Sequence, residues 1–351
     1  MPADHRITDL FGIQLPVIQA PMAGSSTPDM AVAVAEAGGL GSLPSAQYAV
    51  PQLREAILGI RARTDRPLNV NFFCHANPAE DPAAQVAWRA RLQPFYDEAG
   101  LSHLVPPAGP GRAPFDDAFC AVVEELRPEV VSFHFGLPAQ DLLERVRRTG
   151  ARILSSATTV REAIWLESQG VDAVIAMGAE AGGHRGNFLT HDMAGQVGTM
   201  ALVPQVVDAV SVPVIAAGGI ADKRGVAAAF ALGASAVQVG TAYLFTREAN
   251  VNALYRAALE GAAGDDTALT NLFTGRPARG ILNRLMREVG PLNPLAPAFP
   301  TAGGMLAPLR QAAEAKGAAD FTNLWAGQAV AVSRIASAAD LTRELAAGVP
   351  G

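Results

Sequence analysis

Short, mainly apolar runs alternate with amphipathic helical patterns between residues 1 and 245. This alternation is typical of βα units and therefore of a parallel sheet. The helices carry start signals of their own: Thr27-Pro28-Asp29 offers a capping hydroxyl, a proline at the first helical position and an acid for the helix dipole. Eight strands are predicted, at Val17–Ala20, Leu40–Leu43, Leu68–Phe73, Val130–Phe133, Arg152–Ser156, Ala173–Ala176, Val214–Ala217 and Ala236–Val239.

Two segments interrupt this alternation. Residues 75–114 are rich in proline and predict an insertion after the third strand, with one helix near Gln85–Ala99. Residues 246–351 predict a helical cap with a break at Pro291–Pro300. Eight strands with helices between them predict an α/β fold, a TIM (β/α)₈ barrel over residues 1–245. A doubly wound sheet needs only six strands, and no G-x-G-x-x-G follows the first one.

Composition excludes several classes of protein. The chain is 50% hydrophobic and 17% charged, which excludes a disordered protein. Its net charge of −6 gives no attraction for a nucleic acid. Val226–Phe245 has no charged residue, but its glycines and polar side chains predict a buried helix and strand, not a membrane span. Because the N-terminus carries acids where a secretory signal would be basic, we expect a soluble, cytoplasmic protein.

The reactive side chains limit the chemistry further. Lys223 and Lys316 are the only lysines, and no predicted strand carries one, which argues against Schiff-base catalysis. The two cysteines cannot build a disulfide framework. His184, His191 and Asp192 share one loop, but no H-x-H or paired carboxylate accompanies them, so no metal site is predicted.

Glycines follow the last two predicted strands, where a barrel of this type binds phosphate. Gly218-Gly219 comes after the seventh strand, and Gly240-Thr241 ends the run Gln238-Val239-Gly240-Thr241 after the eighth. Glycines allow backbone N–H groups to approach an anion closely. The alternative is a pair of ordinary tight turns, and a phosphate site alone does not distinguish a flavin mononucleotide from a sugar phosphate.

Polar side chains at other strand ends are candidates for catalysis or binding. Asn71 could meet the polar edge of a flavin or nucleobase, or could cap its own loop. His134 follows the fourth strand and could act as a general base, or be a core histidine with satisfied hydrogen bonds. His184 and Arg185 could face an anionic substrate, or hold their loop through backbone hydrogen bonds. His75 and His103, in the insertion, are expected to face solvent.

The strand ends and the loops that follow them carry a series of short motifs, which are Gln19-Ala20-Pro21-Met22-Ala23-Gly24, Gly38-Gly39-Leu40-Gly41, Asn69-Val70-Asn71, Val131-Ser132-Phe133-His134-Phe135-Gly136, Glu180-Ala181-Gly182-Gly183-His184-Arg185-Gly186, Ala216-Ala217-Gly218-Gly219-Ile220 and Gln238-Val239-Gly240-Thr241. Their joint pattern resembles the nitronate monooxygenase family from about Phe11 to Phe245, and more loosely through Gly275–Gly280 and Leu324–Gln328.

The resemblance implies a barrel that binds FMN and oxidises alkyl nitronates, or nitroalkanes as well, with O₂ to carbonyl compounds and nitrite. It implies that His134 and His184 are catalytic and that Arg185 is available to the anionic substrate. The cofactor-binding residues that it implies are Ala20, Pro21, Met22 and Ala23 against the isoalloxazine, Asn71 on its polar edge, Gly182 and Gly183 beside it, and Gly218, Gly219, Gln238, Val239, Gly240 and Thr241 at the phosphate.

One position departs from the family pattern. Met177 stands where the family usually has a glutamine, which puts one contact to the flavin in doubt. Related FMN-dependent NAD(P)H:quinone reductases and enoyl reductases share the glycine-rich loop, but tend to lack the Ser-Phe-His-Phe-Gly arrangement. A phosphate-binding barrel without catalysis is the alternative from another class, and His134 at a strand end argues against it.

Overall fold

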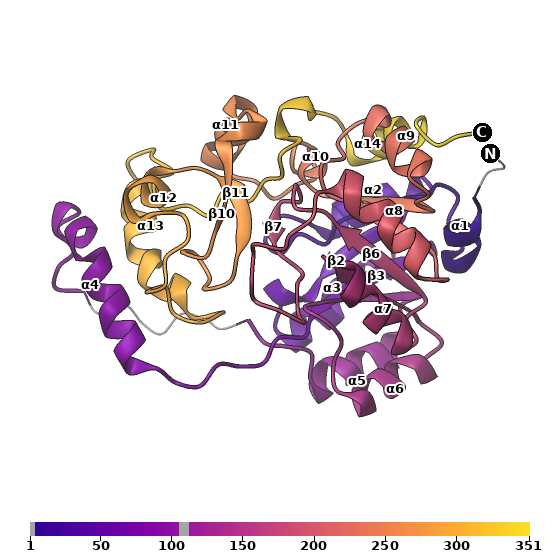
Figure 1. The fold of residues 1–351 in the computed structure, drawn as a ribbon, viewed down its shortest axis with the longest axis horizontal. Coiled ribbons are helices and arrows are strands. Elements are labelled where there is room, and N and C mark those ends of the chain that lie inside the picture. The colour runs from indigo at the N-terminus through magenta and orange to yellow at the C-terminus, as the bar shows by residue number, and fades with distance from the viewer. Residues whose placement is uncertain (1–3, 105–111) are drawn as a thin grey trace.

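The computed structural model describes residues 4–104 and 112–351, and eight parallel strands form its central sheet (Figure 1). These strands are β1 (Val17–Gln19), β2 (Gly41–Pro44), β3 (Leu68–Phe73), β4 (Val130–His134), β5 (Arg152–Ala157), β6 (Ala173–Met177), β8 (Val214–Ala217) and β9 (Ala236–Val239). The strand order is β1-β9-β8-β6-β5-β4-β3-β2, and a parallel bridge between Ile18 and Leu40 joins the two outer strands. The backbone N–H of Gln19 donates to the Leu40 carbonyl at 3.0 Å. The sheet therefore closes into the predicted TIM barrel.

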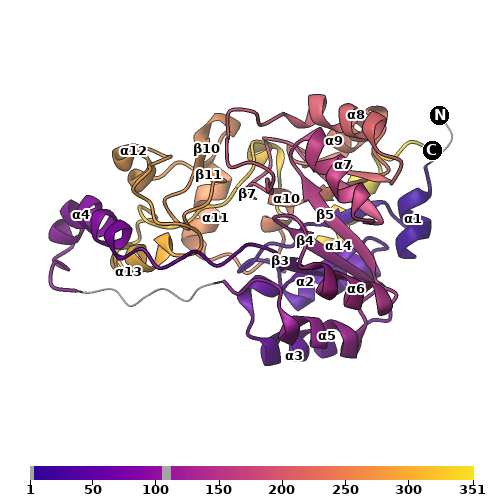
Figure 2. The same cartoon turned by 60° about the horizontal axis from the view of Figure 1, so that its bottom comes forward.

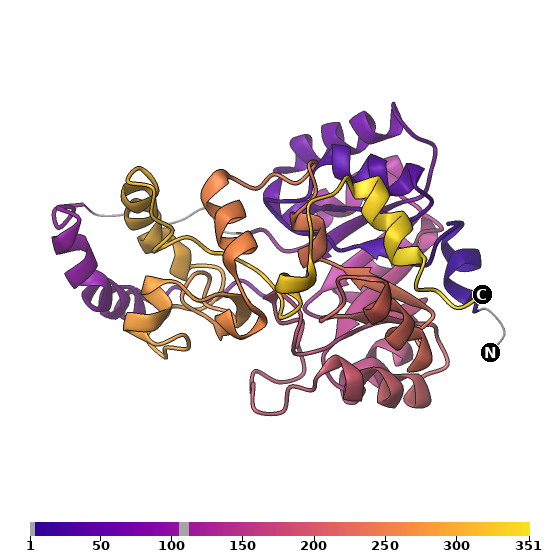
Figure 3. The same ribbon diagram turned by 90° about the horizontal axis from the view of Figure 1, so that it is seen from above.

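Helices surround this barrel, and the last of them comes from the far end of the chain. They are α2 (Pro28–Glu36), α3 (Val50–Arg61), α5 (Asp117–Leu126), α6 (Gln140–Arg148), α7 (Val160–Ser168), α8 (Thr199–Ala209), α9 (Lys223–Ala231) and α14 (Ala338–Ala346). Helix α14, yellow in Figure 3, packs against α2, α9 and β1. Its Leu341 and Leu345 are buried in the barrel core. The barrel therefore does not end at residue 245, because residues 338–346 supply its eighth helix.

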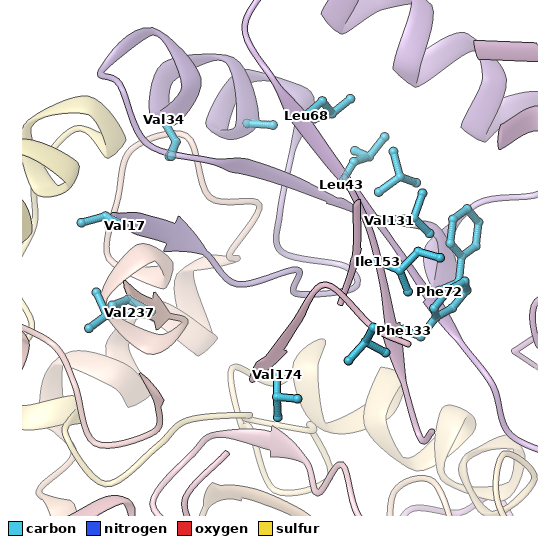
Figure 4. Packing of buried hydrophobic residues seen from close by; sticks show 14 of the residues in the cluster. Val17, Val34, Leu43, Leu68, Phe72, Val131, Phe133, Ile153, Val174 and Val237 are labelled. Carbon is cyan, nitrogen blue, oxygen red and sulfur yellow. The ribbon is translucent and has the colours of Figure 1, made fainter. Parts of the chain in front are cut away.

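The alternation of side chains along the strands divides the core into two layers. Val17, Leu43, Val131 and their neighbours point outward and pack under the helices (Figure 4). Ile18, Leu154 and other inward residues fill the amino-terminal half of the barrel. The short helix α1 (Arg6–Phe11), which the sequence analysis did not predict, closes that end with Ile7 and Phe11.

The side chains that point into the barrel change from apolar to polar toward the carboxyl ends of the strands. The side chains that point inward there include five polar ones, those of Asn71, Ser132, His134, Ser156 and Gln238, and Asn71 is in register with Ser132. A polar layer inside a barrel is costly unless it meets partners or a ligand. The sequence therefore places its buried polar groups at the end where barrel enzymes carry their sites.

The helix of the insertion and the part of the C-terminal region before α14 fold together into a second lobe, to the left in Figures 1 and 2. Helix α4 (Pro82–Glu98) packs through Trp88 and Leu92 against Leu285 and Leu309. The Trp88 indole N–H donates to the Ala302 carbonyl at 3.2 Å. The other elements of this region are α11 (Ala253–Gly261), β10 (Thr267–Thr270), β11 (Ala278–Ile281), α12 (Arg284–Val289) and α13 (Ala307–Glu314). The short helix α10 (Thr241–Leu244) follows β9 and is buried in the barrel core through Ala242 and Tyr243.

A small antiparallel sheet, absent from the prediction, ties this lobe to the barrel. Its strand order is β10-β11-β7, and β7 (Gly183–His184) belongs to the glycine-rich loop after β6. Ala278 pairs with His184, and Arg279 pairs with Gly183. The cap is therefore not purely helical, and its strand β11 fixes the backbone at His184. None of the helices in the described ranges is long and apolar enough to cross a lipid bilayer.

Candidate active site

A cavity opens at the carboxyl ends of the barrel strands and is covered by the second lobe. Residues from β3, β4, β5, β6, β8 and β9 and from the segment after β1 form its floor, and Arg112, Tyr255 and Trp325 contribute from the insertion and the cap. The predicted site residues that line it are Ala20, Pro21, Met22, Ala23, Asn71, His134, Gly182, Gly183, His184, Gly218, Gly219, Gln238, Gly240 and Thr241. The fold therefore brings together residues that are far apart in the sequence.

Two predicted site residues do not line this cavity. Val239 points outward from β9 and is buried in the core beneath the helices. Arg185 is fully buried, and its guanidinium donates to the carbonyls of Gly178 at 2.6 Å and Met177 at 2.9 Å. It also donates to the Gln196 side chain at 2.8 Å. Arg185 therefore holds the loop after β6, which agrees with the loop-holding alternative and not with substrate contact.

Replacing Arg185 with methionine should destabilise the protein, because it removes a buried hydrogen-bond donor from the Met177 and Gly178 carbonyls and from Gln196, and only the Gly178 carbonyl keeps another donor within the described part of the chain, the Ala181 N–H. We expect a loss of about 3 kcal/mol in the free energy of unfolding, measured by denaturant titration. Arg161→Met is the control, since Arg161 is exposed on α7 and should change stability by less than about 0.5 kcal/mol. An Arg185 variant that keeps wild-type stability but loses substrate affinity would restore the substrate role.

Glycine backbone forms one wall of the cavity. Gly218 and Gly219 have positive φ values of 105° and 71°, a conformation that side chains rarely adopt. A Cβ on Gly182 would lie 2.5 Å from the Gly327 nitrogen, whereas a Cβ on Gly183 would meet nothing within 4 Å. Gly183 therefore leaves open space on the cavity side, and backbone groups can approach a bound molecule closely.

Two amides on the cavity floor offer hydrogen bonds to a ligand. The Gln238 Oε1 atom is buried and has no hydrogen-bond partner in residues 4–104 and 112–351. The Asn71 Nδ2 atom donates to Ser132 Oγ at 3.0 Å, a bond that leaves the Asn71 oxygen unused. A buried acceptor without a partner costs free energy, so a donor from a bound molecule would stabilise this arrangement.

His134 has both ring nitrogens engaged. Its Nδ1 lies 2.6 Å from Ser156 Oγ, and its Nε2 lies 3.2 Å from the His184 carbonyl oxygen. Burial and the positive charge of Arg276 lower the pKa of His134 to about 3. The imidazole is therefore neutral at physiological pH, and it has no free lone pair with which to take a proton from carbon.

His184 lines the same cavity. Its Nε2 is 2.9 Å from Thr274 Oγ1, and its ring lies between Phe299 and Trp325 at centroid distances of 5.4 Å and 5.5 Å. Burial, followed by the charge of Arg112, holds the pKa of His184 well below its usual range. Both histidines of the site are therefore uncharged.

These low pKa values predict a dependence of stability on pH. His134 takes up a proton near pH 6.5 when unfolded but only near pH 3 when folded, so the unfolded state binds more protons between these values. Stability is therefore full above pH 6.5 and is lost as the pH falls, by about 1.4 kcal/mol per pH unit for each such group. Chemical denaturation at pH 7.0 and 5.0 should show a smaller loss for His134→Asn than for wild type; equal losses would contradict the assignment.

Several residues of the site were not predicted from the sequence. Arg112, Phe299 and Tyr255 come from the insertion or the cap, whose packing cannot be read from strand patterns. Trp325 stands within Leu324–Gln328, which the family resemblance had marked. His75, expected in solvent, is instead buried against Phe299 at a centroid distance of 4.8 Å.

Two arginines near the cavity have no carboxylate partner. Arg112 lines the cavity and donates to the Ala46 carbonyl at 3.2 Å. Arg276 lies over the Phe135 ring at 3.9 Å and donates to the Asn187 carbonyl. No acid of the described residues forms an ion pair with either of them, and the same residues contain no cluster of potential metal ligands. Arg112 therefore gives the cavity lining a cation without an acidic partner, and Arg276 adds a second positive charge nearby.

Comparison with known proteins agrees with this geometry. Residues 4–348 match the family model for nitronate monooxygenase. The chain is 44% identical to a nitronate monooxygenase of Pseudomonas aeruginosa, with 97% of each chain covered. It is 42% identical to a nitronate monooxygenase of Paraburkholderia phytofirmans, with 96% of this chain and 92% of the relative covered.

Two solved structures are also similar to this chain over almost all of its length. A nitroalkane oxidase from Streptomyces ansochromogenes has a TM-score of 0.88 and 40% identity, with 98% of this chain and 97% of that chain covered. FabK from Thermotoga maritima has a TM-score of 0.72 and 29% identity, with 98% and 95% covered. The match of the family model to almost all of the sequence, together with relatives above 40% identity, leads to one conclusion. The chain belongs to the nitronate monooxygenase family.

Proposed function

We propose that this protein is an FMN-dependent enzyme that oxidises alkyl nitronates with O₂ to carbonyl compounds and nitrite. The observation that carries the proposal is a cavity lined by two neutral histidines and by Arg112, which has no acidic partner among the described residues. Such a pocket stabilises an anion, and a nitronate is the anion of a nitroalkane. A neutral nitroalkane must first lose a proton from carbon, and the hydrogen bonds of His134 leave no free base for that step. We therefore infer that the preformed nitronate is the preferred substrate.

The residues present fit FMN. The unpartnered Gln238 oxygen would accept a hydrogen bond, and the free face of Gly183 would lie along the ring system. Gly219 and Gly240 would bring backbone N–H groups to the phosphate, as the glycine pattern predicts. Met177 lines the cavity where the family usually has glutamine, so Gln238 and Asn71 would supply the side-chain amides. When bound, FMN supplies the electron-accepting group of the reaction.

In this proposal, the side chains around the cavity bind the anion, limit the access of water and donate a hydrogen bond. Arg112, carried by the insertion, would attract and hold the negative charge of the nitronate. The aromatic rings of Phe299 and Trp325 enclose His184 and limit the access of water. The neutral His134 would donate a hydrogen bond from Nε2 to an oxygen of the substrate.

An aerobic product assay tests the proposed function. The purified protein is mixed with an alkyl nitronate, and nitrite and the carbonyl product are measured together with oxygen uptake. We expect nitrite in amounts equal to the nitronate consumed. Failure to form nitrite, combined with NADH-dependent reduction of a quinone, would favour the reductase alternative.

Arg112→Gln should weaken nitronate binding more than turnover. Loss of one desolvated cation from the binding site should raise KM about tenfold, while kcat changes by less than a factor of about three. Arg152→Gln is the matched control, because this half-exposed arginine pairs with Asp172 at the start of β5, remote from the cavity. Unchanged KM values in the Arg112 variant would refute its role in charge recognition.

A further inference from the structure

A serine hydroxyl and a backbone carbonyl contact the two ring nitrogens of His134. Ser156 stands near the end of β5, beside β4, and its hydroxyl lies 2.6 Å from His134 Nδ1. The partner of Nε2 is a carbonyl oxygen at 3.2 Å, and a carbonyl can only accept a hydrogen bond. Nε2 therefore carries the hydrogen, and Nδ1 accepts the hydroxyl hydrogen of Ser156.

The surroundings hold this pair in place. Ser156 is 4% exposed, so water does not compete strongly for its hydroxyl. A Cβ on Gly186 would lie 2.9 Å from His134 Cε1 and 3.0 Å from Ser156 Oγ. Gly186 does not have a positive φ, so it is space and not backbone conformation that requires glycine there. The loop after β6 thus packs directly against the serine–histidine pair.

The bond on the other side of the ring is weaker. A distance of 3.2 Å is at the long end for an N–H···O hydrogen bond. Its N–H can therefore be shared with a negatively charged oxygen that enters the cavity, which both His134 and Ser156 line. A ring in the opposite tautomer would present a lone pair to that oxygen and repel it.

We propose that Ser156 is a positioning residue, which keeps neutral His134 in the Nε2–H tautomer so that it donates to the nitronate oxygen. This role rests on the proposed function, since it requires an anionic substrate. Ser156 itself does not touch the substrate in this account, and it undergoes no covalent change.

The tautomer can be observed without any turnover. The chain has six histidines, so selective ¹⁵N labelling gives few side-chain signals, and the His134→Asn spectrum identifies those of residue 134. We expect wild type to show a protonated Nε2 and a bare Nδ1 at this residue. Ser156→Ala should shift both nitrogens toward a mixture of tautomers, and Ser156→Thr, which keeps the hydroxyl, should restore the wild-type pattern.

Activity gives the second readout. Ser156→Ala should lower kcat for a nitronate about tenfold, the scale expected for one hydrogen bond to a charged group. In the His134→Asn background the same substitution should have almost no effect, because the residue it positions is gone. Ser155→Ala is the control: the Ser155 hydroxyl donates to the carbonyls of Phe133 and Gly136, not to His134. It should leave the tautomer unchanged.

The NMR signals and the kcat values together distinguish failure of the Ser156 proposal from failure of the proposed function. An unchanged tautomer in Ser156→Ala would overturn the proposal, as would an equal loss of kcat in the wild-type and His134→Asn backgrounds. Absence of nitronate oxidation in the wild-type enzyme would refute the proposed function, and with it the role of Ser156 in that reaction. In that case the NMR result alone would decide whether Ser156 orients His134.

Discussion

Replacing Gly219 with aspartate is expected to weaken FMN binding by about 10²-fold or more. Gly219 has a φ of +71°, and its added Cβ would lie 3.4 Å from the Cβ of Glu180. The new carboxylate would stand beside the carboxylate of Glu180 and, in our proposal, beside the phosphate of FMN. Like charges in a site with little water repel strongly, and a loss of about 2.7 kcal/mol corresponds to this factor.

The flavin content of the purified protein and a titration of the apoprotein with FMN both measure this effect. Gly219→Ala separates backbone strain from charge and should lose far less affinity than the aspartate variant. Gly195→Asp is the matched control, because Gly195 is exposed and its Cβ would meet nothing within 4 Å. Full flavin content in Gly219→Asp would mean that the phosphate site lies elsewhere.

Replacing His134 with asparagine should lower kcat for a nitronate by about 10- to 10²-fold. The neutral imidazole donates one hydrogen bond to the anion in our account, and hydrogen bonds to charged groups have about this value. A neutral nitroalkane should be a poor substrate even for wild type, because the ring has no free lone pair to remove the α-proton. This differs from the general-base role expected from the sequence.

The two roles of His134 predict opposite patterns. A general base would make His134→Asn lose nitroalkane turnover by about 10²-fold and nitronate turnover much less. The donor role predicts the larger loss with the nitronate, and no change in kcat near pH 6.5, because the pKa of His134 is about 3. His191→Asn, a change at an exposed loop position, serves as the control. Rapid wild-type turnover of a nitroalkane at a pH where it is fully protonated would contradict the donor role.

The barrel strands were predictable because each is buried on both faces. Runs such as Leu68–Phe73 and Val214–Ala217 are continuous in sequence and match the observed strands at both ends. The eighth helix was not assigned to the barrel, because its place beside β1 depends on the chain returning after the cap. Likewise, the two-residue strand β7 forms only because β11 lies next to it.

The candidate site was largely predictable because the carboxyl ends of parallel strands meet at one end of a barrel. Arg185 was placed on the cavity only because it follows His184 in the sequence. Neighbouring residues of an extended segment point to opposite sides, so Arg185 turns away where His184 turns in. Arg112 could not be predicted, since nothing in a proline-rich insertion indicates that it folds back over the barrel.

An anaerobic titration followed at flavin wavelengths tests the central claim, that an anionic nitronate is the reductant this site is built to accept. The FMN-loaded protein is titrated in separate experiments with an alkyl nitronate, with the corresponding neutral nitroalkane at acidic pH, and with NADH. We predict that the flavin absorbance falls promptly with the nitronate and stays nearly unchanged with the other two. Rapid loss of the absorbance with NADH and none with the nitronate would contradict the account and favour a reductase.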